Sequence, residues 1–211
     1  MAELRGLYAI TPPRLEGTAL AAAVEAALAG GCRILQYRYK GTDGAGRLRD
    51  ALTLAELCRR HDALFIVNDD PELALACGAH GVHLGRDDTP YEAARRRLGA
   101  EAIIGLSCYA DFERARWAAG VGADYLAFGA FYPSTTKPGA VRAHPELLRR
   151  AGRELGRPLV AIGGITPENA LPLIAAGAQM VAVIQGLFAQ PDIEAAARRF
   201  ADLFAIARGP S

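Results

Sequence analysis

A chain of 211 residues, of which 51% are hydrophobic and 22% charged, has the composition of a globular protein with ample apolar material for a core. The formal net charge of +1 gives no global field that would attract nucleic acid or a membrane surface, so any anion site must be built locally. No segment approaches the about 18 consecutive apolar residues of a membrane helix, and the N-terminal segment lacks the pattern of a signal peptide. We therefore expect no nucleic-acid or membrane partner.

The cysteines are dispersed along the chain at Cys32, Cys58, Cys77 and Cys108, and no two of them form a C-x-x-C pair. This spacing argues against a disulfide framework and against a zinc site. We expect reduced thiols in a cytoplasmic protein.

Strand-like and helix-like segments alternate along the chain. The expected strands are short apolar runs at residues 6–11, 34–40, 64–69, 81–85, 102–108, 124–130, 158–164 and 180–186. The expected helices are rich in Ala, Leu, Glu and Arg, and they span residues 20–30, 46–61, 71–78, 91–99, 112–122, 145–156, 167–177 and 193–209. Several of these helices end in glycine, which is typical of a helix C-terminus.

The order of these segments indicates the fold class. The strands are mostly continuous apolar runs, as expected for parallel strands that are buried on both faces. Strict alternation of strand and helix favours a parallel sheet with right-handed connections, and eight such units fit a single (β/α)8 TIM barrel domain over residues 1–211. A doubly wound open sheet is the alternative. In a barrel, the chemistry belongs at the carboxyl ends of the strands and in the loops that follow them.

Polar residues occupy the end of the second expected strand. Gln36, Arg38 and Lys40 alternate there with Tyr37 and Tyr39. Side chains along a strand alternate between its two faces, so the Gln, Arg and Lys side chains are expected to share one face. If the tyrosines pack outward against the helices, these three polar groups face the mouth of the barrel. An edge strand with a solvated face is the alternative.

Carboxylates follow the third and fourth expected strands, in the pairs Asp69 and Asp70 and then Asp87 and Asp88. Asp69 and Asp88 would lie about 5 Å apart at the ends of neighbouring strands, where two unpaired carboxylates repel each other. A hard divalent cation relieves this repulsion, and Mg²⁺ commonly takes one or two carboxylates together with substrate phosphates. A turn-forming role is the alternative for all of these residues, and we expect a turn or helix-capping role for Asp70 and Asp87.

The later strands carry a different kind of polar group. The loop after the sixth strand combines hydroxyl donors with a cation, in the run Ser134, Thr135, Thr136 and Lys137, although an ordinary turn can have the same composition. Loops after the seventh and eighth strands of a barrel frequently hold a phosphate on backbone N–H groups, and the pair Gly163 and Gly164 permits a close approach of backbone to ligand. The sequence thus predicts two anion-binding regions. One is built from side chains of strands two to five with Lys137, and the other from the backbone of strands six to eight.

In their order and spacing, these motifs resemble those of the thiamine-phosphate synthase (thiamine-phosphate pyrophosphorylase) family. The matching segments are QYRYKG, FIVNDD, GVHLGRDD, GLSCY, GADYLAFGAFYPSTTKPGA, AIGGIT and AVIQGLF. The resemblance as a whole extends from residue 6 to about residue 188. The resemblance implies a (β/α)8 transferase with Mg²⁺ as cofactor. Its reaction would condense 4-amino-5-hydroxymethyl-2-methylpyrimidine diphosphate with 4-methyl-5-(2-phosphoethyl)thiazole, or its carboxylated form. Thiamine phosphate would form and pyrophosphate would leave by a dissociative mechanism.

The resemblance also assigns residues to the two phosphorylated substrates. The pyrimidine diphosphate would be held by Gln36, Tyr37, Arg38, Tyr39, Lys40, Asn68, Ser107 and Lys137, of which Arg38, Lys40, Ser107 and Lys137 would be catalytic. The thiazole phosphate would be held by Ser134, Thr135, Thr136, Gly164, Ile184 and Gln185. Asp69 and Asp88 would bind Mg²⁺. Gln185 stands where the family often has Ser, which is tolerable if the phosphate is bound by the backbone N–H.

Other functions on the same barrel make different demands on these residues. A thiazole tautomerase, which is an isomerase, should not need two metal-binding aspartates or the full Gln-Arg-Lys cluster. A non-catalytic thiamine-metabolite binding protein should have lost the metal ligands or Lys137. A phosphosugar isomerase would need an acid-base pair at opposing strand ends, and His83 within the fourth strand is interpreted instead as a packed or pocket-wall residue. The family resemblance further implies a homodimer.

Overall fold

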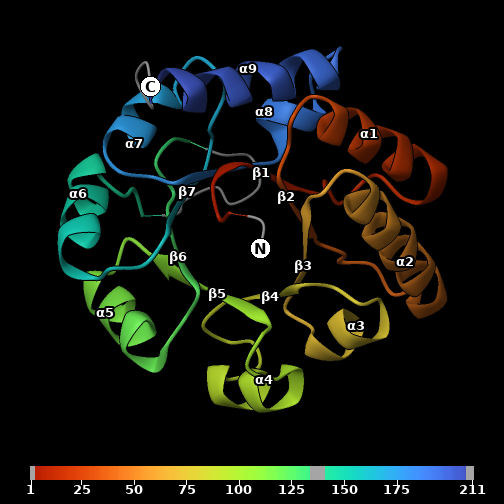
Figure 1. The fold of residues 1–211 in the computed structure, drawn as a ribbon, viewed down its shortest axis with the longest axis horizontal. Helices are drawn as coiled ribbons and strands as arrows, with labels where there is room; N and C mark the ends of the chain where they lie inside the picture. Colours follow the sequence, from red (N-terminus) through yellow and green to blue (C-terminus); the bar gives the residue numbers. More distant parts are fainter. Residues whose placement is uncertain (1–2, 134–140, 208–211) are drawn as a thin grey trace.

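The computed structural model describes residues 3–133 and 141–207. In these residues, eight parallel strands close into a barrel in the order of the sequence, and the helices form a ring outside it (Figure 1). The strands are β1 (Gly6–Ile10), β2 (Ile34–Tyr37), β3 (Leu64–Asn68), β4 (Gly81–Leu84), β5 (Ile103–Tyr109), β6 (Tyr125–Phe128), β7 (Leu159–Ile162) and β8 (Met180–Val183). The barrel closes where β1 pairs with β8. The expected (β/α)8 fold is confirmed, and the open sheet is not found.

The helices follow the strands in the order expected from the sequence. They are α1 (Gly17–Ala29), α2 (Gly44–Arg60), α3 (Pro71–Ala76), α4 (Tyr91–Leu98), α5 (Phe112–Val121), α6 (Pro145–Glu154), α7 (Leu171–Ala175), α8 (Gln185–Phe188) and α9 (Ile193–Ile206). The short α8 directly after β8 was not expected as a separate element. The last helix, α9, packs against both α8 and α1, so it closes the ring of helices where the barrel itself closes (Figure 1).

Local sequence explains where several helices begin. Asp43, Asp70, Asp111 and Asp192 each precede a helix, and each side chain accepts hydrogen bonds from backbone N–H groups of the first turn. A short side-chain oxygen at this position satisfies donors that the helix itself leaves unpaired. The expected capping role of Asp70 ahead of Pro71 is therefore confirmed, which separates this residue from the neighbouring Asn68 and Asp69.

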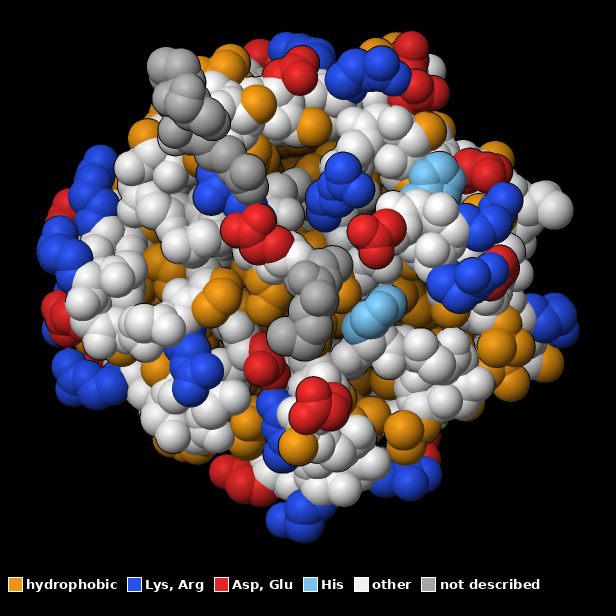
Figure 2. Space-filling view, viewed as in Figure 1, with side chains coloured by type: hydrophobic (Ala, Val, Ile, Leu, Met, Phe, Trp, Pro, Cys, Tyr) orange, Lys and Arg blue, Asp and Glu red, His pale blue; other side chains and the backbone are white. Residues whose placement is uncertain are grey.

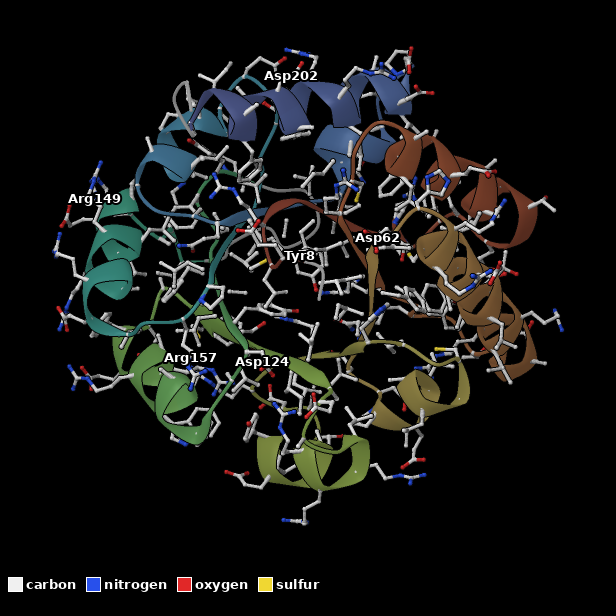
Figure 3. The ribbon with its side chains drawn as sticks, in the orientation of Figure 1. Tyr8, Asp62, Asp124, Arg149, Arg157 and Asp202 are labelled. Atoms are coloured by element: carbon white, nitrogen blue, oxygen red, sulfur yellow. The ribbon has the colours of Figure 1, made fainter. Side chains whose placement is uncertain are left out.

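The apolar residues form two layers, because each strand has one face toward the barrel axis and one toward the helices. The inner layer includes Tyr8, Ile66, Tyr125 and Met180. A larger outer layer lies between the barrel and the helices and contains, among others, all of the cysteines as free, buried thiols. Tyr8 lies near the centre of the ring, whereas Arg149 on α6 points away from it (Figure 3).

The surface agrees with the nearly neutral composition. On the face shown in Figure 2, acidic and basic side chains are interspersed, and neither sign covers a broad area. Within the described ranges, no helix combines the length and the apolar character that a membrane crossing requires.

Candidate active site

A cavity of about 410 Å³ opens at the carboxyl ends of the strands. Its lining includes Tyr8, Gln36, His83 and Ser107 from within the strands, and Arg38 and Asn68 from the strand ends. The opposite wall is formed by backbone and small residues that follow β6, β7 and β8. A polar wall and a glycine-rich wall thus face each other across one space.

Side chains from five strands form a hydrogen-bond chain at the base of this cavity. Gln36 Nε2 lies 2.8 Å from the Tyr8 hydroxyl, which lies 2.7 Å from the Tyr125 hydroxyl. His83 continues the chain, with Nδ1 3.0 Å from the Tyr125 hydroxyl and Nε2 2.8 Å from Oγ of Ser107. His83 is therefore a pocket-wall residue, as expected, and it connects the buried tyrosines to Ser107.

The sequence motifs did not indicate a role for Tyr8 or Tyr125. Both are almost completely buried, at 1% and 0% exposure, and burial raises the pKa of each hydroxyl above its usual value, so both stay protonated. The signal that could have revealed them is a tyrosine inside an otherwise apolar barrel strand, because a buried hydroxyl requires a hydrogen-bond partner.

A second cavity, of about 610 Å³, lies beside the first, over the loops that follow β2, β3 and β4. Asn68 lines both cavities, whereas Asp69 and Lys40 line only this second one. Lys40 Nζ lies 2.7 Å from Oδ2 of Asp69. The charged residues expected around one anion site are therefore divided by the end of β3.

The expectation that Gln36, Arg38 and Lys40 share one face is wrong for Lys40. The strand β2 ends at Tyr37, and the alternation of side chains holds only within a strand. Gln36 and Arg38 line the central cavity, while Lys40 lines the second cavity and pairs with Asp69.

The two tyrosines of the same segment lie apart from the central cavity. Tyr37 is 2% exposed and belongs to the outer apolar layer, on the opposite face of β2 from Gln36. This position confirms that Tyr37 packs outward, and it does not support a contact with the pyrimidine diphosphate. Tyr39 packs against the same layer and also lines the second cavity.

The carboxylates of Asp69 and Asp88 contact each other, and their pKa values shift in opposite directions. Partial burial on its own raises the pKa of Asp69, but hydrogen bonds with Lys40 and Asp88 outweigh it and hold that pKa below its usual value. Partial burial and then the Asp69 carboxylate raise the pKa of Asp88. Two acidic groups so close together resist simultaneous ionisation, and the Lys40 ammonium favours the charge on Asp69.

Backbone geometry brings these carboxylates together. Asp69 has a φ of 66°, in the left-handed region that Asp tolerates better than most residues, and its N–H donates to the carbonyl of His83 on β4. Asp88 lies beyond the end of β4, in a turn that folds back so that its Oδ2 accepts the Gly85 N–H at 2.6 Å. A Cβ at Gly85 would approach that oxygen to 2.8 Å, so a larger residue there would displace the Asp88 carboxylate.

The opposite wall of the central cavity is built from backbone. Gly163 and Gly164 follow β7 with φ values of 105° and 62°, and a Cβ on Gly164 would lie 2.2 Å from the carbonyl oxygen of Pro133. Ile184 and Gln185 line the same wall where β8 passes into α8. A Cβ is excluded at both glycines, so a ligand beside them can meet main-chain groups, while Ile165, Thr166 and Gln185 also line this wall.

Four of the expected site residues, Ser134, Thr135, Thr136 and Lys137, lie outside the described residues. The described residues resume at Val141, and the N–H of Ala143 donates to the carbonyl of Ala130 at 2.9 Å. The expectation for this loop stays a prediction from the sequence.

Comparison with known proteins places the chain in a family. The family model described as thiamine monophosphate synthase matches residues 7–187. The chain belongs to the thiamine monophosphate synthase family. The resemblance found from the sequence motifs is confirmed, and the expected class of enzyme, a thiamine-phosphate synthase transferase, is confirmed with it.

Individual relatives cover nearly the whole chain. A thiamine-phosphate synthase of Thioalkalivibrio sulfidiphilus is 55% identical over 204 residues, covering 96% of this chain and 97% of that protein. One of Chromobacterium violaceum is 56% identical over 201 residues, covering 95% and 97%. The structure of thiamine phosphate pyrophosphorylase from Pyrococcus furiosus has a TM-score of 0.88 and 35% identity, covering 97% of both chains.

For a thiamine monophosphate synthase family member, the acidic pair is the natural place to test for a metal. Within residues 3–133 and 141–207, no three His, Cys, Asp or Glu side chains gather as a ready-made metal cluster. Asp69 and Asp88 supply hard oxygen ligands that contact each other. This donor set fits Mg²⁺, which accepts one or two carboxylates when phosphate oxygens complete its shell.

Proposed function

We propose that the protein condenses 4-amino-5-hydroxymethyl-2-methylpyrimidine diphosphate with 4-methyl-5-(2-phosphoethyl)thiazole, or its carboxylated form, in a Mg²⁺-dependent reaction. The observation that carries the proposal is that the two cavities share Asn68 in their linings. A pocket lined by Gln36, Arg38 and Ser107 meets the Asp69–Asp88 carboxylate pair across Asn68. A ring bound in the pocket could therefore extend a diphosphate toward the acidic pair.

Charge explains how the diphosphate is held. Arg38 lines the central cavity, Lys40 lines the second, and Asn68 lines both, so a diphosphate beside Asn68 can meet both cations. Each unit charge at about 4 Å and an effective dielectric constant of about 20 contributes on the order of 4 kcal/mol of attraction before desolvation. The Ser107 hydroxyl and the Asn68 amide add neutral hydrogen bonds. The proposal includes Lys137 on the basis of its sequence motif alone.

Asp69 and Asp88 would hold Mg²⁺, which when bound supplies Lewis-acid stabilisation to phosphate oxygens. Lys40 contributes to the charge balance of this pair through its 2.7 Å ion pair with Asp69. When a diphosphate arrives, Lys40 has a second anionic partner within reach. The pair thus keeps the aspartate ionised and oriented until the ligands are complete.

The thiazole phosphate belongs on the backbone wall. Gly163, Gly164 and the segment Ile184–Gly186 line it, and their main chain offers N–H groups to an anion without the obstruction of side chains. Ser134, Thr135 and Thr136 are assigned to the same phosphate from the sequence motif. The two phosphorylated groups then lie at opposite walls, with both rings between them.

The bond changes require no general base. The bond between the methylene carbon and the diphosphate oxygen breaks, and its electron pair leaves with pyrophosphate. The aminopyrimidine donates electron density to the developing cation, and the lone pair of the thiazole nitrogen forms the new C–N bond. Fixed positive charge placed where negative charge develops lowers such a barrier. The residues therefore act by positioning two substrates and by stabilising a leaving group.

We also propose that residues 1–211 act as one domain in a cytoplasmic homodimer. The free state of all four cysteines supports a reducing compartment. Light scattering on the purified protein would measure the mass of the assembly directly, and a monomer at micromolar concentration would contradict the dimer.

The test of the reaction is direct. The purified protein is incubated with both substrates, with Mg²⁺ or with a chelator, and thiamine phosphate is measured by fluorescence after oxidation. We expect product only with Mg²⁺. No product with Mg²⁺ would contradict the proposal, and isomerisation of a thiazole carboxylate phosphate without condensation would identify the tautomerase instead.

A further inference from the structure

The hydrogen-bond chain at the base of the cavity has a direction. Gln36 Nε2 carries only donors, so the Tyr8 oxygen accepts from it. Tyr8 must then place its own proton elsewhere, and at 1% exposure the only acceptor for it in the described residues is the Tyr125 hydroxyl. Tyr125 in turn is fully buried, and the acceptor for its proton is Nδ1 of His83.

The direction of the chain fixes the ring of His83. Since Nδ1 accepts from Tyr125, the ring proton lies on Nε2, which faces Oγ of Ser107 at 2.8 Å. The Ser107 oxygen therefore accepts from His83, and its hydroxyl proton is left for a group in the cavity that Ser107 lines. At the other end of the chain, Gln36 uses its amide nitrogen, so its Oε1 is left as an acceptor.

The barrel is shaped to hold this chain. His83, Gly105 and Tyr125 lie in register on β4, β5 and β6, with Gly105 between the other two. A Cβ on Gly105 would come within 1.9 Å of the Tyr125 ring. Because Gly105 has no side chain, Tyr125 crosses above it and stacks on His83, with ring centroids 5.6 Å apart and planes 15° apart.

We propose that Tyr8, Tyr125 and His83 are positioning residues that set the polarity of the cavity through this chain. They present the Ser107 hydroxyl as a donor to the diphosphate and the Gln36 amide oxygen as an acceptor to the pyrimidine amino group. This inference rests on the proposed function for the identity of the substrate groups. The direction of the chain is a property of the protein without substrate.

Consequently, Tyr125, which lines neither cavity, acts on the reaction through the residues at the ends of the chain. Removing the Tyr125 hydroxyl takes away the hydrogen bond that it donates to Nδ1 of His83, and with it one constraint on the tautomer and orientation of the ring. Ser107 then no longer has a His83 ring held in place as its donor, and its hydroxyl proton is no longer directed toward the leaving diphosphate. An interaction of this kind grows with the charge on the leaving oxygen, so its loss lowers kcat more than it raises KM.

The first measurement needs no substrate. Multiple-bond ¹H–¹⁵N spectra of protein labelled in its histidine rings report which nitrogen carries the proton, and His83→Gln identifies the resonances of His83. We expect the Nε2–H tautomer in the wild-type protein and a shifted Nδ1 resonance in Tyr125→Phe. A ring protonated on Nδ1, or on both nitrogens, at pH 7.5 would overturn the inference.

The second measurement is a kinetic cycle with Tyr125→Phe, Ser107→Ala and the double variant. We expect Tyr125→Phe to lower kcat about five- to tenfold, with both KM values within about twofold, as for one ordinary hydrogen bond. In the Ser107→Ala background the same substitution should change kcat less than in the wild-type background, because its route to the leaving diphosphate is gone and only the route through Tyr8 and Gln36 is left. Equal effects in both backgrounds would contradict a role through Ser107.

Tyr91→Phe is the matched control. Tyr91 is also buried and its hydroxyl donates to the carbonyl of Gly122 at 3.0 Å, but it lies on α4 and lines neither cavity. We expect it to lose stability with kcat unchanged, and an equal loss of kcat would point to a general structural effect. If the wild-type protein forms no thiamine phosphate, the proposed function fails, while the tautomer measurement still tests the chain.

Discussion

The two walls of the central cavity differ in whether side chains or main-chain groups form them. The wall over β2 to β5 consists of side chains, with Arg38 and Ser107 in the cavity and the Asp69–Asp88 pair beyond Asn68. The wall over β6 to β8 consists of backbone at Gly163, Gly164 and the start of α8. The first kind of site depends on the identity of charged groups, and the second depends on the path of the chain.

This difference governs how each wall should respond to substitution. Removing a charge from the side-chain wall should reduce the rate and leave the fold intact. Adding even one carbon to the backbone wall should change the path of the chain, so that binding and stability fall together.

The largest effect is expected at the acidic pair. Asp69→Asn and Asp88→Asn each remove a charge needed to hold Mg²⁺, and we expect kcat to fall about 100-fold or more at saturating substrate. The thermal midpoint should change little. Asp87→Asn, one residue away and exposed, is the control. Wild-type turnover in both site variants would remove the metal from the proposal.

A smaller effect is expected at Arg38. Loss of a charged hydrogen bond to the diphosphate in Arg38→Gln should lower kcat/KM for the pyrimidine substrate about 10- to 100-fold. Arg33→Gln, an exposed position just before the same strand, should retain wild-type kinetics. Steady-state rates with the thiazole substrate saturating provide the comparison. Equal losses in both variants would indicate a general effect of charge rather than a contact.

The backbone wall is tested with Gly164→Ala. The new Cβ would lie 2.2 Å from the Pro133 carbonyl oxygen, and the residue would have to keep a φ of 62°. We therefore expect the free energy of unfolding to fall by about 1–3 kcal/mol. KM for the thiazole phosphate should rise about tenfold as main-chain hydrogen bonds are displaced.

The control for that variant is Gly156→Ala. Gly156 has a similar φ of 59°, yet nothing lies within 4 Å of its Cβ position. It should lose about 1 kcal/mol without any change in KM, because only the conformational penalty remains. If both variants bind the thiazole phosphate normally, the backbone wall is not its site.

The smallest effect is expected at Gln185. If the phosphate is bound by the main chain where β8 passes into α8, Gln185→Ala should keep KM for the thiazole phosphate within about threefold. Initial rates across a range of thiazole phosphate provide the measurement. A larger rise would show that the amide side chain binds phosphate, and the distinction between the two walls would then weaken at this point.

The side-chain wall could be predicted from the sequence more completely than the cavity as a whole. Asn68, Asp69 and Asp70 directly follow an apolar strand, so their place at a strand end was readable, and the cap at Asp70 follows from the proline after it. The division of Arg38 from Lys40 was not readable. It depends on the residue at which β2 ends, and hydrogen bonding to β1 and β3 decides that.

The tyrosine chain shows the other limit of the sequence. Tyr8 and Tyr125 are 117 positions apart, and each is unremarkable in its own segment. They meet because both side chains point to the barrel axis, where a hydroxyl needs a partner and Gly105 leaves room for a ring. Which hydroxyl faces which depends on the stagger of neighbouring strands, a property of the closed barrel.

By itself, the sequence determined the alternation of strands and helices, the barrel that eight such units form, and the residue types at the strand ends. These follow from local periodicity, capping and turn chemistry, which act over a few neighbouring residues. Only the tertiary structure decided that Asp88 folds back to Asp69, that Lys40 pairs with Asp69 and lines a different cavity from Arg38, and that side chains of five strands join in one hydrogen-bond chain. Those contacts arise when the barrel closes. Closure fixes the register of neighbouring strands and brings side chains from distant parts of the chain into one interior.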